Sequence, residues 1–198
     1  MAEPVRPPWT TDEFFAWQEL QADRYELVDG APLRMMAGAK NVHDDIVVNL
    51  IAMLRERLRG GPCRPFTGDG AVETRPGQIR RPDVGVDCGR RNPISTLAAE
   101  PKLLIEVLSP TTRDFDSFRK LEEYKGRTGV EYILLVEPNE PLAALWSREG
   151  EAWIERRVAG LAETVGLPVL RLSLSMADIF DGVEFTTTPR LVAARPGE

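Results

Sequence analysis

Glu106 is the side chain with the greatest chemical meaning in this sequence, because it stands within the apolar run Leu103–Leu108. Alternate residues of such a run lie on opposite faces of a strand, so the run predicts a central strand that is covered on both sides. An ionised carboxylate buried there is costly unless a cation, hydrogen-bond donors or a bound proton compensates for it. Two interpretations follow: Glu106 is a metal ligand, or it is a structural carboxyl that is neutral or paired with an arginine.

Asp83 supplies a second carboxylate at the start of the preceding expected strand, directly after Arg80, Arg81 and Pro82. If the two strands are neighbours, Asp83 and Glu106 converge at one edge of the sheet. Carboxylate oxygens are the ligands that hard divalent cations such as Mg²⁺ prefer. Asp is also common where strands start and turns are capped, so the pair carries more information than Asp83 alone.

Lys120 falls in an expected helix that follows the Glu106 strand closely enough to fold back over the strand ends. An ammonium group beside a metal-bound phosphate would stabilise the developing negative charge or help to orient the attacking water. The competing interpretation is a pair of helix-surface ion pairs, because Asp116 and Glu123 stand at helical spacing from Lys120.

Further residues near these three have both a functional and an ordinary interpretation. Ser109 and Asp114 border the connection between the acidic strand and the following helix, where they would orient water or phosphate, or else cap the helix. His43 is the only histidine and stands at the start of the main expected helix, whereas Glu26 lies in an expected hairpin. Candidates for phosphate contacts are Arg80, Arg81 and Arg113.

A mixed set of helices and strands must position these side chains. Apolar spacing and capping residues predict helices over 11–20, 42–58 and 114–127, and a closing helix that begins at Ser175. In the third helix, Phe118, Leu121 and Tyr124 recur at three-residue steps. Strands are expected over 25–28 and 31–35, joined by Asp29-Gly30, and over 71–74, 83–88, 102–108, 131–136, 142–146, 152–158 and 170–174. The pattern is that of an α/β protein with helices interleaved among strands.

Composition indicates a soluble protein that folds without disulfides. The chain has 198 residues, 42% of them hydrophobic, and no segment is apolar for long enough to cross a membrane. We expect a single domain over 11–185 between an N-terminal tail, 1–10, and a C-terminal tail, 186–198. The N-terminus lacks the apolar core of a secretion signal, so a cytoplasmic location is expected, with Cys63 and Cys88 as reduced, buried thiols.

The charge distribution neither favours nor excludes a polyanionic substrate. The net charge is −6, which on average repels nucleic acid. Between Arg75 and Arg127, however, Lys and Arg outnumber Asp and Glu, so the middle of the chain is locally basic within an acidic protein.

Several segments resemble one known family in the same order along the chain. These segments are Tyr25–Gly30, the helix near His43, Arg81–Val86, Leu104–Thr112 with Asp114, and Lys120–Tyr124. Together they resemble the bacterial restriction endonuclease-like proteins of the Uma type, a branch of the PD-(D/E)XK nuclease superfamily, from about Thr10 to Asp181. The resemblance implies a restriction endonuclease-like core, in which a central mixed β-sheet is flanked by helices beside an N-terminal hairpin.

The same resemblance assigns roles to the acidic pair. It makes Pro82-Asp83 the PD element and Glu106-Val107-Leu108 the (D/E)XK element, with Leu108 in place of the usual lysine. Lys120 would then serve as a migrated lysine that reaches the site from the next helix. The implied catalytic residues are therefore Asp83, Glu106 and Lys120, of which Asp83 and Glu106 are the metal ligands.

The function expected from these residues and this resemblance is a DNA endonuclease that uses Mg²⁺ or Mn²⁺ to activate water. Glu26, His43, Ser109, Asp114, Arg81 and Arg113 would surround the metal or contact the substrate. One alternative is a catalytically silent module that keeps the nuclease fold for binding or assembly, and another is a hydrolase of a small phosphate ester. Cleavage of both DNA strands would need two sites, and residues 142–146 with Trp153 offer an apolar edge for a homodimer.

Overall fold

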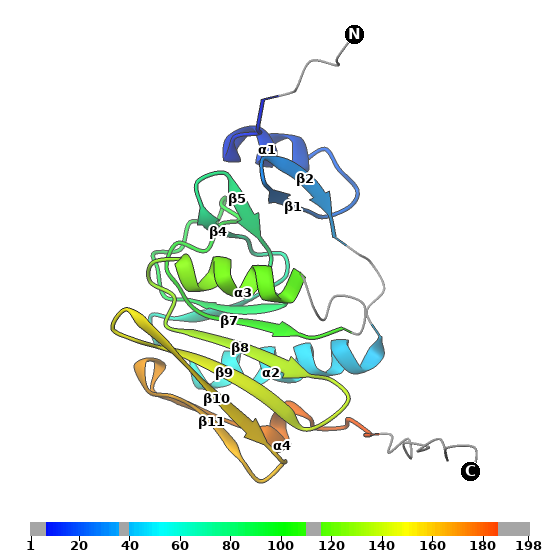
Figure 1. The fold of residues 1–198 in the computed structure, drawn as a ribbon, viewed down its shortest axis with the longest axis vertical. Helices are drawn as coiled ribbons and strands as arrows, with labels where there is room; N and C mark the ends of the chain where they lie inside the picture. Colours follow the sequence, from blue (N-terminus) through cyan, green and yellow to red (C-terminus); the bar gives the residue numbers. More distant parts are fainter. Residues whose placement is uncertain (1–6, 36–39, 110–115, 186–198) are drawn as a thin grey trace, which may run out of the picture.

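A six-stranded mixed sheet forms the centre of the protein, with the strand order β10-β9-β8-β7-β6-β3 (Figure 1). The computed structural model describes residues 7–35, 40–109 and 116–185. The strands of this sheet are β3 (Arg64–Thr67), β6 (Val84–Asp87), β7 (Pro101–Val107), β8 (Tyr132–Glu137), β9 (Leu142–Glu149) and β10 (Ala152–Ala159). The expected α/β class with a central mixed sheet is confirmed.

Only one pair of neighbours in this sheet, β7 and β8, runs parallel. A parallel pair needs a crossover, and helix α3 (Asp116–Gly126) lies in the connection between these two strands. The strand before β7 pairs with it in the antiparallel sense, with Val84 of β6 opposite Ile105 of β7. This arrangement brings the first residues of β6 to the same sheet edge as the last residues of β7 and the start of α3.

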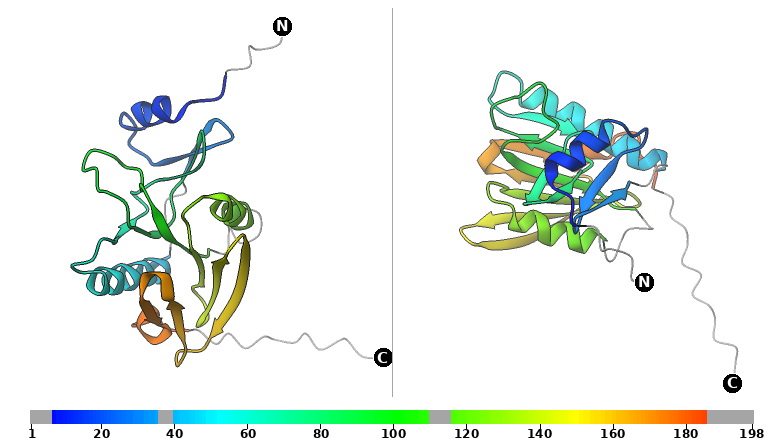
Figure 2. Two further views of the ribbon diagram at one scale, coloured as in Figure 1. Left: turned by 90° about the vertical axis from the view of Figure 1, so that its left-hand side faces the viewer. Right: turned by 90° about the horizontal axis from the view of Figure 1, so that it is seen from above.

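Helices cover both faces of the central sheet, as Figure 2 shows for α2 (Asn41–Arg57) and α3. Ile46, Leu50 and Leu54 of α2 pack on the face formed by alternate residues of β6 and β7, including Ile105. Short elements complete this face: β11 (Thr164–Leu167), a 3₁₀ turn over Pro168–Leu170, β12 (Leu172–Ser175) and α4 (Met176–Ile179). The opposite face of β7 packs through Leu104 against α3. The expected central strand, apolar on both faces except at Glu106, is confirmed.

A second, four-stranded sheet with the order β2-β1-β5-β4 carries the N-terminal part of the chain. Its strands are β1 (Tyr25–Val28), β2 (Ala31–Arg34), β4 (Val72–Arg75) and β5 (Gln78–Arg80). Helix α1 (Thr11–Gln18) begins with the capping box of Thr10 and Glu13, and its Phe14 packs against Leu27 and Ile79. The β1–β2 turn places Asp29 and Gly30 at φ 50° and 75°, the left-handed conformation that this dipeptide favours.

The elements that the sequence did not predict are short strands. β3, β5 and β11 contain three or four residues each and include Pro65, Arg80 and Gly166, residue types that are uncommon in isolated strand patterns. The three apolar residues of α3 do not share one environment, because the exposed fraction of Phe118 is 63% whereas Leu121 and Tyr124 are buried. Three-residue steps drift by about 60° per step around a helix, so Phe118 is rotated away from the face that Tyr124 occupies.

The two cysteines form a disulfide, which corrects the expectation of reduced thiols. Arg64 of β3 pairs with Asp87 of β6, so Cys63 and Cys88 are the next residues along these antiparallel neighbours. Their Cα atoms are 4.0 Å apart, and their sulfur atoms are bonded. This pairing has no local signal in the sequence, because it depends on the short strand β3. The expected cytoplasmic location stays a prediction.

The expected apolar edge around 142–146 does not lie at an edge of the sheet. β9 is covered on one side by β8 and on the other by β10. Ala143 and Leu145 are buried, and the ring of Trp146 lies beneath the Lys125 ammonium. Trp153, the other residue of the expected edge, does belong to the outer strand β10, and the homodimer stays a prediction. In the described part of the chain, no helix combines the length and the apolar character needed to cross a membrane.

The close contact between Phe66 and Gly85 yields a prediction about the central sheet. A Cβ atom on Gly85 would lie 2.2 Å from Cζ of Phe66, so Gly85→Ala forces this ring to move. We expect the free energy of unfolding in urea to fall by about 1–3 kcal/mol, the usual cost of overpacking. Gly166→Ala is the matched control, since a Cβ on Gly166 meets nothing within 4 Å. Equal effects of the two substitutions would contradict this account.

Candidate active site

The antiparallel register of β6 and β7 brings Asp83 and Glu106 together. Because Val84 lies opposite Ile105, the next residues outward, Asp83 and Glu106, are also opposite each other. Oδ2 of Asp83 accepts a hydrogen bond of 2.8 Å from the backbone N–H of Val107, which holds the carboxylate against the end of β7. The two acids therefore lie together, as predicted, where β6 begins and β7 ends.

Glu106 is held by α3 rather than by an arginine. Its Oε1 accepts a hydrogen bond of 2.6 Å from the Tyr124 hydroxyl and lies 3.5 Å from Nζ of Lys120. Burial raises the pKa of Glu106 to about 7 from its ordinary value of 4.5, against the opposing attraction of Lys120, and the Asp83 charge raises it further. The positive charge already present is therefore too small to offset the loss of water around this carboxylate.

Lys120 connects Glu106 to the N-terminal hairpin. Its Nζ lies 3.3 Å from Oε1 of Glu26 in β1 and 3.5 Å from Oε1 of Glu106 in β7. The expected surface pair with Glu123 does not form, because Glu123 faces Arg80 instead. Lys120 therefore belongs to the buried cluster with Glu26 and Glu106, and its catalytic role stays a prediction. The side chain of Asp116, the other residue at helical spacing from Lys120, lies outside the described part of the structure.

Arg80 is the structural centre of this cluster, and sequence analysis assigned it a different role. Its guanidinium is fully buried and donates to Oε2 of Glu26 at 2.8 Å and to both carboxylate oxygens of Glu123, at 2.7 and 2.8 Å. The pKa of Arg80 is raised by these two acids although burial acts against it. Arg80 therefore binds Oε2 of Glu26 while Lys120 lies near Oε1, and its complete burial corrects the expectation that it contacts phosphate.

The roles of Glu123 and Arg80 have no local signal in the sequence, whereas that of Tyr124 has one. Tyr124 stands one helical turn after Lys120, which places both on the same face of α3, and this spacing was available. The same spacing is equally typical of core packing, so it does not identify the hydrogen bond between Tyr124 and Glu106. The bond between Arg80 and Glu123 depends on β5, a strand of three residues that the sequence did not reveal.

His43 lies in the first turn of α2, where its Nε2 is 3.2 Å from Oδ2 of Asp83. The hydrogen bond to Asp83 raises the pKa of His43, against the effect of burial. The side chain is 18% exposed, so it stands at the mouth of the cluster. Four of the predicted residues, Glu26, Asp83, Glu106 and Lys120, and the imidazole of His43 are therefore gathered from β1, β7, α2, α3 and the start of β6.

Arg81 contacts this cluster through its backbone, whereas its side chain binds backbone oxygens elsewhere. The Arg81 guanidinium donates to the backbone oxygens of Tyr25 and Asp69, and its backbone N–H donates to Oε1 of Glu26 at 2.9 Å. Ser109 follows the end of β7. Arg113 and Asp114 lie outside the described residues.

The carboxylates of this cluster fit a magnesium site that is completed by water and substrate, and not a site enclosed by protein side chains alone. Among residues 7–35, 40–109 and 116–185, no group of three His, Cys, Asp or Glu side chains is arranged to enclose a metal ion. Mg²⁺, however, is usually held by one or two carboxylates and completes its coordination with water and substrate phosphate. Asp83 and Glu106 provide such a pair, and the raised pKa of Glu106 marks a place where added positive charge is favourable.

Comparisons with known proteins agree with this architecture. Residues 11–177 match the model of the Uma2 family, described as "Putative restriction endonuclease". The chain belongs to this family. The resemblance proposed from the sequence motifs is thereby confirmed.

Two relatives of this Uma2 protein illustrate the match. An uncharacterized protein of Synechocystis sp. is 29% identical over 182 residues, which cover 90% of this chain and 95% of that protein. A crystal structure titled as a putative nuclease belonging to DUF820 from Anabaena variabilis aligns with a TM-score of 0.68 and 19% identity. The alignment covers 89% of this chain and all of the other, so the two proteins share one fold.

The burial of Arg80 between two acids predicts a large stability effect. Arg80→Met would leave Glu26 and Glu123 buried without their shared cation, and breaking such a pair typically costs about 3–5 kcal/mol. We expect a loss of this size in the free energy of unfolding, measured by urea denaturation. Arg34→Met removes an arginine from an exposed pair with Asp23 and should change stability by less than about 1 kcal/mol. An Arg80→Met protein as stable as the parent would refute the central role of Arg80.

The raised pKa of Glu106 predicts a pH dependence of stability for the protein in EDTA. The folded state keeps a proton on Glu106 up to about pH 7, whereas the unfolded state releases it near the ordinary pKa of 4.5. Wild-type stability is therefore lost as pH rises across this window, relative to Glu106→Gln, which does not titrate. We expect the variant to become the more stable protein by up to about 3 kcal/mol above pH 7. Parallel stability curves for the two proteins from pH 4 to 8 would contradict the prediction.

Proposed function

We propose that this Uma2 protein is a DNA endonuclease that depends on Mg²⁺ or Mn²⁺. The observation that carries the proposal is the convergence of Asp83, Glu106 and Lys120 at the point where β6, β7 and α3 meet. The family is described as "Putative restriction endonuclease", and the protein of similar fold is titled as a putative nuclease. Both descriptions support phosphodiester hydrolysis as the reaction and DNA as the substrate class.

Asp83 and Glu106 are the residues that would hold the metal ion. A bound divalent ion polarises the scissile phosphate and lowers the pKa of a coordinated water. The protein contributes the position of the two carboxylates. The backbone N–H of Val107 holds Oδ2 of Asp83, and the Tyr124 hydroxyl holds Oε1 of Glu106. Because these donors come from rigid elements, the carboxylates are fixed before substrate arrives.

Lys120 is the group that would act on the phosphate. Its ammonium lies against Glu106 and Glu26, so it stands beside the metal ligands on the α3 side of the site. A cation fixed there stabilises negative charge that develops on the phosphate oxygens, in surroundings where water competes little. The structure thus supports Lys120 in the role that Leu108 cannot fill. His43 would position Asp83 from the other side.

The proposed activity is tested by nicking of supercoiled plasmid DNA. We expect nicking with Mg²⁺ or Mn²⁺ and none in EDTA, and we expect Glu106→Gln to lower the rate by at least about 100-fold, the scale of losing a transition-state interaction. Glu149→Gln makes the same chemical change at an exposed position of β9 and should leave the rate unchanged. Nicking in EDTA, or equal rates for the two variants, would overturn the proposal.

A catalytically silent module is the second candidate. It is favoured by Leu108 at the motif position that normally holds lysine, and by the lack of a three-residue metal cage among the described residues. Titration calorimetry with Mn²⁺ separates the two functions, since the nuclease must bind the ion and Asp83→Asn must abolish the heat. A flat titration of the parent protein would support the silent module.

The plasmid products also distinguish cleavage of one strand from cleavage of both. Nicked plasmid indicates that one strand is cut, whereas linear plasmid indicates that both strands are cut, as expected of a homodimer.

A further inference from the structure

Two arginines next to the candidate active site converge on one carboxylate. Arg75, at the end of β4, lies 3.0 Å from Oδ1 of Asp29, and Arg119, in α3, pairs with Oδ2 of the same residue. Asp29 occupies the tip of the β1–β2 hairpin. A carboxylate held by two guanidinium groups from separate elements has the arrangement in which proteins bind the oxygens of a phosphate group.

This arrangement contributes little to stability, because it is exposed. The side chains of Arg75 and Asp29 are 61% and 58% exposed, and that of Arg119 is 32% exposed. Ion pairs at such exposure contribute at most about 1 kcal/mol each. The fully buried Arg80 already ties the hairpin to α3 through Glu26 and Glu123. The Asp29 contacts are therefore not needed to hold these elements together.

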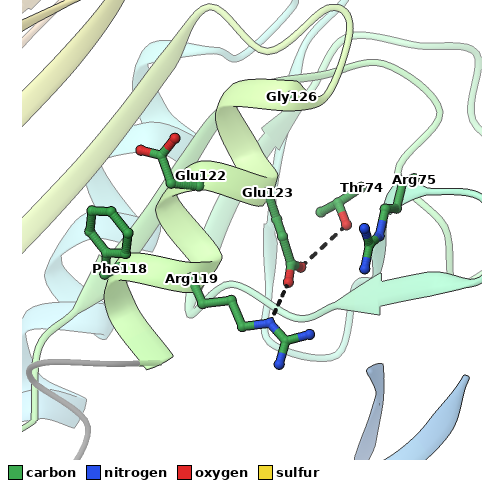
Figure 3. Close-up of a pocket in the computed structure, with 7 residues that line it drawn as sticks. All are labelled: Thr74, Arg75, Phe118, Arg119, Glu122, Glu123 and Gly126. Carbon is green, nitrogen blue, oxygen red and sulfur yellow. Dashed lines mark hydrogen bonds and ion pairs between the residues drawn. The ribbon is translucent and has the colours of Figure 1, made fainter. Parts of the chain in front are cut away.

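The position of the arginines suits a DNA strand that passes through the candidate site. Arg119 precedes Lys120 in α3 and also lies 3.3 Å from Glu123, which binds Arg80. Arg75 and Arg119 line a pocket of about 520 Å³ over α3 (Figure 3). The pocket is as large as typical small-ligand sites and is walled on one side by the exposed ring of Phe118.

The acidic residues of this pocket are matched by cations. Glu123 is held by Arg80, and Oε1 of Glu122 lies 2.8 Å from Nζ of Lys125. Glu123 also lies 3.3 Å from Nε of Arg119, so its charge is shared between Arg80 and Arg119, whereas the charge of Glu122 is directed to Lys125. An exposed aromatic ring beside basic side chains is the combination with which proteins bind single nucleic-acid strands, the base on the ring and the phosphate on the cation.

We propose that Arg75 and Arg119 form a phosphate subsite for a single DNA strand, which the Asp29 carboxylate fills in the free protein. The nucleotide next to that phosphate lies in the pocket against Phe118. This assignment extends the proposed nuclease function and rests on it for the identity of the strand. Binding of DNA requires Asp29 to leave the two guanidinium groups, so Asp29 limits affinity.

The test measures binding of a fluorescein-labelled single-stranded oligonucleotide in EDTA, where cleavage plays no part. Asp29→Asn removes the competing charge but keeps a residue type that tolerates the left-handed turn conformation. We expect the dissociation constant to fall by about tenfold, the effect of gaining one charge-assisted hydrogen bond. We also expect it to depend more steeply on salt concentration. Asp23→Asn is the matched control, because it removes the same charge from another exposed pair, with Arg34.

The assignment requires that the gain depend on Arg75. Adding Arg75→Gln to Asp29→Asn should return the affinity to the parent value. Equal gains in Asp29→Asn and Asp23→Asn would show a net-charge effect and overturn the subsite, as would unchanged or weaker binding by Asp29→Asn. Because no step needs hydrolysis, tighter binding by Asp29→Asn in a protein that does not nick plasmid would refute the nuclease function and leave the subsite standing.

Phe118 provides a separate test of the nucleotide position. Phe118→Ala should weaken binding of the intact oligonucleotide several-fold, since stacking contributes about 1–3 kcal/mol per base. The same substitution should leave binding of an abasic oligonucleotide unchanged, because that strand has no base to stack. Equal weakening for both oligonucleotides would overturn the placement of a base in the pocket. Thermal unfolding of the variant checks that the exposed position tolerates alanine.

Discussion

The burial of the Glu106 carboxylate in an apolar strand is the constraint on which the rest of this site depends. Its neighbours in β7 pack into the two hydrophobic faces of the sheet, and its side chain is 12% exposed, so little water reaches the charge. Two groups of α3 approach it, the Tyr124 hydroxyl and the Lys120 ammonium, yet its pKa stays raised to about 7. The folded protein therefore holds a carboxylate that gains from further positive charge, which is the condition for retaining a divalent cation.

Lys120 can support this carboxylate only because a second acid holds it from the other side. Glu26 belongs to the N-terminal hairpin, and Arg80 keeps it in place while also binding Glu123 of α3. The alternation of acid and base, from Glu106 through Lys120, Glu26 and Arg80 to Glu123, joins both sheets to the same helix. The hairpin is thus part of the site rather than an appendage, and its tip brings Asp29 beside α3.

Sequence patterns predicted the elements that depend on local periodicity, and they failed for elements and contacts that depend on residues distant in the sequence. The alternation around Glu106, the turn at Asp29-Gly30 and the apolar stripe of α2 each report a local preference, and all three elements exist as expected. The adjacency of Asp83 and Glu106 followed because consecutive strands usually pair. The disulfide and the Arg80 cluster depend on β3 and β5, strands of three or four residues whose place is set by tertiary pairing.

The replacement of the motif lysine by Leu108 becomes intelligible from the topology of β7 and α3. In an extended strand, residues 106 and 108 point to the same face, so a lysine at 108 would reach the Glu106 carboxylate from within the strand. Here the chain beyond β7 leads to α3, which packs on that same face and presents Lys120 and Tyr124 one turn apart. The helix supplies the cation together with the hydroxyl that orients Glu106. A lysine is then not required at position 108, and an apolar residue there is compatible with an active site.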